Sequence, residues 1–248
     1  RYRAGKARQD ARVIACEQWW KLRHWDYFDK SGNELDNRPT SAWLFNCIIS
    51  KHADGIEAFP EDFLTSADAA VDYFHQNPPK GTIYVCGTES LKGQLRAAGL
   101  PVAASADDRV SAVLLGYDTE LTYQKLEDCC ILLGRGADYI ATHPDMVCPT
   151  WYGSAPDCGS FIEMLFTATG RRPKILGKPQ PDMALAAMRR MGYAPEQTCI
   201  LGDRIYTDIA CGVNAGIDAV FLLSGEGVMA DIEKYNVHPS YVFQNGRL

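Results

Sequence analysis

After residue 64, short apolar runs alternate with helical patterns, and this alternation constrains the fold more than any other feature of the sequence. The runs have the length of strands, and the segments between them repeat apolar residues at helical spacing. Strands and helices that alternate in this way form βαβ units around a parallel sheet. The pattern predicts strands at 82–86, 112–115, 139–141, 174–176, 198–201 and 219–223, and helices around 91–98, 121–133, 160–169, 182–191 and 209–214.

The first 48 residues do not follow this pattern. They hold four of the five tryptophans among charged residues, and no clean strand precedes Trp43–Ile49. These tryptophans could form a partner-binding surface, but we favour core packing or an irregularity of the N-terminal part. With 248 residues, of which 46% are hydrophobic, the chain is long enough for one large domain or two modest ones.

Charge and cysteine usage exclude several classes of protein. The formal net charge is −6 and no basic block occurs, so we expect neither a nucleic-acid partner nor a membrane partner. No apolar run approaches the roughly 18 residues that a membrane-spanning helix needs. The nine cysteines are odd in number and form no CxxC pair, which predicts reduced thiols in a cytoplasmic protein.

Two aspartates beside the predicted strand 198–201 give the strongest local signal for a site. Asp203 follows Gly202 at the end of this strand, and Asp208 enters the first turn of the next helix. Open α/β sheets bind ligands at the carboxyl ends of their strands, and paired carboxylates suit a hard cation such as Mg²⁺. The structural alternative is that Asp203 caps its loop and Asp208 stabilises a helix N-terminus.

A lysine follows the predicted strand 174–176 at what should be the same edge. Lys178 lies between Gly177 and Pro179. An ammonium group held there could neutralise a phosphate or a phosphorylated carboxylate. The alternative is a solvated loop lysine, which is what most lysines are.

Together, the lysine, the helix and strand after it, the Gly-Asp pair and the further aspartate resemble the C-terminal part of the haloacid-dehalogenase (HAD) superfamily of phosphohydrolases. Segments 64–70 and 115–123 resemble the junction where the chain of such proteins enters the cap. Segments 140–145 and 169–173 resemble the cap of one branch, the p-nitrophenyl phosphatase-like and NagD-like proteins with a C2-type cap. The resemblance covers about residues 55–246. It implies an α/β fold with a Rossmann-like parallel-sheet core, formed by 1–65 and 174–248, and an inserted α/β cap at 66–173.

The resemblance also implies roles for individual residues. Lys178 would order the nucleophile and the phosphoryl group, and Asp203 and Asp208 would form the Mg²⁺ site, all three being catalytic. Asn37, His143 and Asp145 would lie on the substrate side. The implied reaction is Mg²⁺-dependent hydrolysis of a small phosphorylated metabolite (a nucleotide monophosphate, a sugar phosphate or a compound like p-nitrophenyl phosphate) through an aspartyl-phosphate. The resemblance leaves open a homodimer formed through the cap.

This chain departs from the family in three places. The family's nucleophile motif, Asp-x-Asp-Gly-Thr, is missing, because the only Asp-Gly pair is Asp54-Gly55, which matches a later loop. Asp36 replaces a hydroxyl residue beside Asn37, where its charge would repel a phosphate. His143 stands where the family usually has Asn, so the leaving group could differ; the alternative is an ordinary surface-loop histidine.

Three explanations of the missing nucleophile compete. The N-terminal part could be truncated or altered; the chain could be a pseudoenzyme; or another carboxylate, such as Asp26, Asp29 or Asp36, could replace the nucleophile. We favour the first. The rival function is a catalytically dead module that binds phosphate or nucleotide on the same scaffold. Metal-dependent turnover of p-nitrophenyl phosphate separates the two functions.

Overall fold

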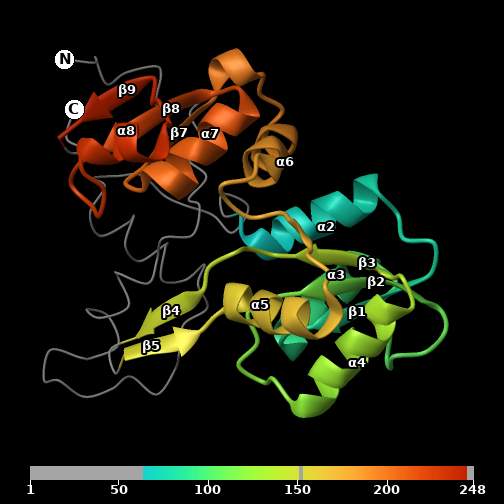
Figure 1. The fold of residues 1–248 in the computed structure, drawn as a ribbon. Helices are drawn as coiled ribbons and strands as arrows, with labels where there is room; N and C mark the ends of the chain where they lie inside the picture. Colours follow the sequence, from blue (N-terminus) through green and yellow to red (C-terminus); the bar gives the residue numbers. More distant parts are fainter. Residues whose placement is uncertain (1–63, 151–152, 245–248) are drawn as a thin grey trace, which may run out of the picture. The chain divides into compact units, whose positions relative to one another are not determined.

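The computed structural model describes residues 64–150 and 153–244 (Figure 1). The described parts of Ser66–Cys148 and Ala155–Leu248 belong to one compact unit. The predictions for Trp43–Ile49, Asn37 and the carboxylates before it lie outside the described residues.

The first sheet has four parallel strands in the order β1-β2-β3-β6. In the ladder, Val85 pairs with Leu114, and Leu114 with Ile140. The strands are β1 (Thr82–Cys86), β2 (Val110–Leu115), β3 (Asp138–Ala141) and β6 (Lys174–Ile175), and the helices around them are α2 (Ser66–Gln76), α3 (Glu89–Ala97), α4 (Tyr123–Gly134) and α5 (Cys158–Thr169).

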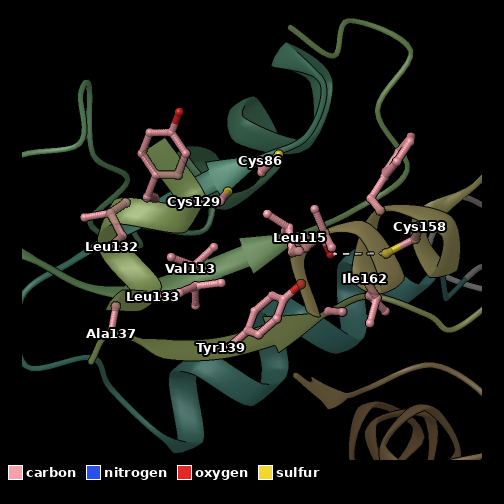
Figure 2. Close-up of a cluster of buried hydrophobic side chains, with 14 residues drawn as sticks. Cys86, Val113, Leu115, Cys129, Leu132, Leu133, Ala137, Tyr139, Cys158 and Ile162 are labelled. Carbon is pink, nitrogen blue, oxygen red and sulfur yellow. Dashed lines mark hydrogen bonds between the residues drawn. The ribbon is translucent and has the colours of Figure 1, made fainter. Parts of the chain in front are cut away.

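Both faces of this sheet are buried, which explains why its strands are apolar at nearly every position. Val113, Leu115 and Tyr139 pack with residues of α4 and α5 on one face (Figure 2). Leu114 and Ile140 pack on the other face with residues of α2 and α3. Neighbours along a strand therefore serve opposite cores, as the period of two in a strand requires.

Buried thiols belong to the first of these cores. The Cys158 thiol donates to the Leu115 carbonyl at 3.7 Å, and burial raises the pKa of Cys158 to about 12 (Figure 2). Cys86 and Cys129 are fully buried in the same cluster. Most of the cysteines among the described residues are buried and act as small core residues.

The second sheet has three parallel strands, in the order β7-β8-β9. Phe221 packs with Ile205 and Ile209 in one cluster, and Met188 packs with Ile217 in another. The elements are α6 (Asp182–Met191), the 3₁₀ turn η3 (Pro195–Gln197), β7 (Cys199–Gly202), the π-helical turn η4 (Ile205–Ile209), α7 (Ala210–Ala215), β8 (Asp218–Leu222), α8 (Ala230–Tyr235) and β9 (Tyr241–Phe243).

The α/β fold with parallel sheets is confirmed, and each predicted strand after residue 64 is present within a few residues. The helix predicted to start at 209 is preceded by a π-helical turn that the sequence pattern did not indicate. The sequence analysis also missed α2, α8, β9 and the paired strands β4 (Val147–Thr150) and β5 (Gly153–Pro156). Apart from α2, these elements are short or carry few apolar residues, so their periodicity is weak. The helix α2 has apolar residues at helical spacing, such as Ala70 and Phe74, and could have been predicted.

The strand β6 lies just beyond the predicted crossing at Pro173, yet it pairs with β3 in the first sheet. Within the described ranges, no strand ladder joins this sheet to β7-β8-β9. The division into a cap at 66–173 and a core at 1–65 and 174–248 stays a prediction. Among the helices of the described ranges, none is long and apolar enough to span a membrane.

One buried lysine fixes the carboxyl ends of β1 and β2. Lys125 Nζ donates to Asp118 Oδ2 at 2.8 Å, to the Gly87 carbonyl at 3.1 Å and to the Glu120 carbonyl at 3.0 Å. The side chain of Asp118 is fully buried and that of Lys125 is 14% exposed. All three donors of the ammonium are therefore used, as a buried charge requires.

We expect Lys125→Met to lower the free energy of unfolding by about 3 kcal/mol, because it leaves the Asp118 carboxylate buried without its partner. Denaturant-induced unfolding followed by circular dichroism measures the change. Lys92→Met is the matched control, since Lys92 pairs with the exposed Glu89 on a helix surface. Equal stabilities of the two variants would contradict the structural role of Lys125.

Candidate active site

A buried ion pair forms the centre of the candidate site. Lys178, two residues after Leu176, donates from Nζ to Asp208 Oδ1 at 2.6 Å. The two side chains are only 11% and 5% exposed. Lys178 is therefore not the solvated loop lysine of the alternative reading. Its ammonium is fixed at the end of β6, next to the carboxylate that the sequence analysis selected.

The π-helical turn η4 carries Asp208 to this position. The amide groups of Asp208 and Ile209 both donate to the Arg204 carbonyl, at 3.0 and 3.2 Å. Ile205 and Ile209 are buried against the second sheet, while Asp208 is turned towards Lys178. The Arg204 amide also donates to Asp208 Oδ2 at 3.3 Å. π-helical turns are rare and often mark functional sites.

Gly202 makes room for Asp208 at the end of β7. A Cβ atom on Gly202 would lie 2.1 Å from the Cβ of Asp208, much closer than real side chains approach. The Asp208 side chain therefore packs directly on the strand backbone. The glycine of the Gly-Asp pair is needed for this close approach.

Asp203 is held by the loop that follows β8. Its Oδ2 accepts from the Glu226 amide at 2.8 Å, and its carbonyl accepts from the Gly227 amide at 2.9 Å. Glu226 in turn accepts from Arg204 Nε at 2.7 Å. The capping role proposed as the alternative for Asp203 is thus present, and it orients a carboxylate at the edge of the sheet.

The loop after β3 brings His143 and Asp145 to the same region. A Cβ on Gly177 would lie 2.5 Å from the Thr142 carbonyl oxygen and 2.9 Å from the His143 Cβ, so this loop and the Lys178 loop are in contact. Asp145 interacts electrostatically with Arg204. Three loops, after β3, β6 and β7, therefore meet at one place.

Two carboxylates are the donors that this site offers to a metal ion. In residues 64–150 and 153–244, no group of three or more His, Cys, Asp or Glu side chains could hold a metal ion. Asp203 and Asp208 nevertheless offer carboxylate oxygens, and Mg²⁺ is often held by one or two carboxylates together with phosphate oxygens and water. Since Lys178 occupies Oδ1 of Asp208, Asp203 is the better candidate for direct contact. The donor chemistry fits Mg²⁺.

Of the predicted site residues, the structure brings Lys178 and Asp208 into contact, and His143 and Asp145 into one loop beside them. Asn37 lies outside the described residues. Arg204, Glu226 and Asp157 were not predicted from the sequence. Arg204 is adjacent to Asp203 and could have been noticed, whereas Glu226 and Asp157 join the region only through folding. The catalytic and binding roles stay predictions.

We expect Gly202→Ala to destabilise the chain by roughly 1–3 kcal/mol or more, because the added methyl group displaces Asp208 from the end of β7. Gly93→Ala is the matched control, since Gly93 lies within α3 with open space around it and alanine favours a helix by about 0.5–1 kcal/mol. Urea titration of both variants measures the effects. A Gly202→Ala variant as stable as the original chain would refute the close packing.

The chain is similar to several known phosphatases. Residues 175–246 match the model of the HAD-hydrolase-like family. An acid sugar phosphatase of Staphylococcus aureus is 33% identical over 190 residues, which are 77% of this chain and 73% of that protein. The structure of a 4-nitrophenylphosphatase from Thermotoga maritima is 34% identical, has a TM-score of 0.69, and the match covers 80% of this chain and 76% of that one.

A p-nitrophenyl phosphatase structure from Archaeoglobus fulgidus is 26% identical, with a TM-score of 0.70 and coverage of 81% of this chain and 78% of that one. The resemblance described from the sequence is therefore confirmed at the level of the family. The chain belongs to the HAD-like phosphatases, in the branch of the p-nitrophenyl phosphatases and NagD-like proteins.

Proposed function

We propose that this protein hydrolyses a small phosphomonoester with the help of Mg²⁺ and through an aspartyl-phosphate. The observation that carries the proposal is the buried pair of Lys178 and Asp208 beside Asp203, at the carboxyl ends of β6 and β7. A fixed ammonium stabilises the charge that develops on a phosphoryl group during transfer. The relatives support the substrate class, since they are phosphatases of sugar phosphates and of p-nitrophenyl phosphate.

In this proposal, each described residue has one task. Lys178 binds a phosphate oxygen and holds the Asp208 carboxylate in place through their ion pair. Asp203, oriented by the Glu226 amide, would hold Mg²⁺ with Asp208 behind it. When bound, Mg²⁺ would neutralise phosphate charge. Asp145 and His143 would lie on the substrate side of the site, and Asn37 is proposed to contact the phosphate.

If the chain shows Mg²⁺-dependent turnover, we propose that its nucleophile is one of the carboxylates of the N-terminal part. Formation of an aspartyl-phosphate needs a carboxylate that attacks phosphorus, and a second acid that protonates the leaving oxygen. Asp26, Asp29 and Asp36 are the residues to replace by Asn, one at a time. The one whose loss abolishes turnover but retains phosphate binding is the nucleophile. We further propose a cytoplasmic location and, as an assembly, a homodimer formed through the cap.

The second candidate is a module that binds phosphate without turning it over. It is favoured by a single observation, the lack of an Asp-x-Asp-Gly-Thr motif in the sequence. The assay that decides is release of p-nitrophenol from p-nitrophenyl phosphate, with Mg²⁺ and with EDTA. Phosphate binding without Mg²⁺-dependent release would establish the second candidate and refute the first.

We expect Asp203→Asn to abolish Mg²⁺-dependent turnover while the fold is retained, because an amide is a poor ligand for Mg²⁺. Lys178→Met should lower turnover by at least about 100-fold, as loss of one charge-stabilising group typically does. Lys234→Met is the control, since Lys234 is exposed on α8. Circular dichroism checks the fold. Unchanged Mg²⁺ affinity and rate in Asp203→Asn would rule out its assignment as a ligand.

A further inference from the structure

The His143 ring lies between two carboxylates. Nδ1 is 3.6 Å from Asp145 Oδ2, and Nε2 is 3.5 Å from Asp157 Oδ1. Both distances exceed those of ordinary hydrogen bonds. Nδ1 is buried and has no hydrogen-bond partner, and the side chain as a whole is only 16% exposed. A neutral ring gains little in this place, whereas a charged ring is attracted to both sides.

The two carboxylates belong to different elements. Asp157 is the N-cap of α5, where its Oδ1 accepts from the Cys158 amide at 2.6 Å, and burial raises its pKa. Asp145 is half-exposed in the loop after β3, and its carbonyl accepts from the Gly159 amide at 2.7 Å. A charged His143 would therefore join the start of α5 to the side chain of Asp145.

Asp145 connects this histidine to the candidate active site. Both Arg204 and Tyr206, which follow β7, interact electrostatically with Asp145. Arg204 also bonds Glu226 from the loop after β8. The charged groups that face the ring are thus Asp145, from its own loop, and Asp157, the N-cap of α5. Gly177 lies beside His143. Arg204, Tyr206 and Glu226 lie beyond Asp145.

We propose that His143 is a positioning residue whose protonation holds Asp145 and the loop after β3 in place for the substrate. This inference rests on the proposed phosphatase function and deepens it, because it assigns to His143 a task that needs no contact with substrate. Protonation also removes one unit of negative charge from a region that contains Asp145, Asp157 and Glu226. A phosphorylated substrate is therefore bound more tightly when the ring is charged.

The first test compares KM at about pH 5.5 and pH 8, a range in which histidine changes its charge. From the lower to the higher pH, KM for p-nitrophenyl phosphate should rise roughly 3- to 10-fold more in the original chain than in His143→Asn. The substrate titrates equally with both proteins, so the difference isolates the histidine. The ratio of kcat at about pH 5.5 to kcat at about pH 8 should be the same in the original chain and in His143→Asn. If His143→Asn does not fold, His143→Gln replaces it in the same comparison of KM values.

The matched control is His238→Asn. His238 is another histidine, but it contacts Asn236 near β9, outside the candidate site. This variant should keep the KM profile of the original chain. Equal KM profiles of His143→Asn and the original chain would overturn the proposal.

The second test needs no turnover. The difference in Tm between the original chain and His143→Asn should be larger at about pH 5.5 than at pH 8, by roughly 2 °C. In an Asp157→Asn background, which keeps a side-chain oxygen for the N-cap, most of this pH-dependent difference should vanish. A difference in Tm without one in KM also overturns the proposal, since the ring would then serve stability alone.

Failure of the proposed function is distinguishable from failure of this inference. If the original chain releases no p-nitrophenol at either pH, the proposed function is refuted. Calorimetric affinity for inorganic phosphate then replaces KM, with the same variants and the same expected difference. Equal affinities and equal Tm values in the original chain and His143→Asn would overturn the role of His143.

Discussion

The ion pair between Lys178 and Asp208 is the interaction on which the candidate site depends. Two almost fully buried charges are stable only as partners, so loss of either leaves an uncompensated charge in a poorly solvated place. The pair joins the end of a strand in the first sheet to a turn beside the second. Because the two charges must stay paired, the end of β6 and the turn η4 are held next to each other, which chain connectivity alone would not require.

Close backbone packing restricts the positions that the side chains of the candidate site can take. At Gly202 and Gly177, neighbouring groups occupy the space that a side chain would need. Carboxylates and carbonyl groups can therefore approach the strand ends directly, where parallel sheets collect their ligands. The hydrogen bond from the Glu226 amide to Asp203 adds a further restraint from the loop after β8. The side chains at this edge are held by main-chain groups from several elements.

The strands of the fold could be predicted from the sequence, because parallel strands that are buried on both faces appear as apolar runs such as Thr82–Cys86. Lys178, Asp203 and Asp208 were predictable since each follows a strand or opens the next helical segment. The proximity of His143 to Asp157 could not be predicted, because it depends on the path of the chain through β4 and β5. The π-helical turn was also missed, since its residues have the same apolar spacing as the start of an ordinary helix.

The π-helical turn has a consequence for how the segment tolerates changes in length. An α-helix closes its hydrogen bonds over four residues, and η4 closes them over five, so one residue is accommodated as a local bulge. A single-residue deletion within Ile205–Ile209 would restore regular helix and rotate the end of β7 by about 100° relative to α7. Ile209 and α7 could keep their packing, but the Asp208 carboxylate would lose its contact with Lys178. Surface loops usually accept insertions and deletions, whereas this segment should keep a constant number of residues.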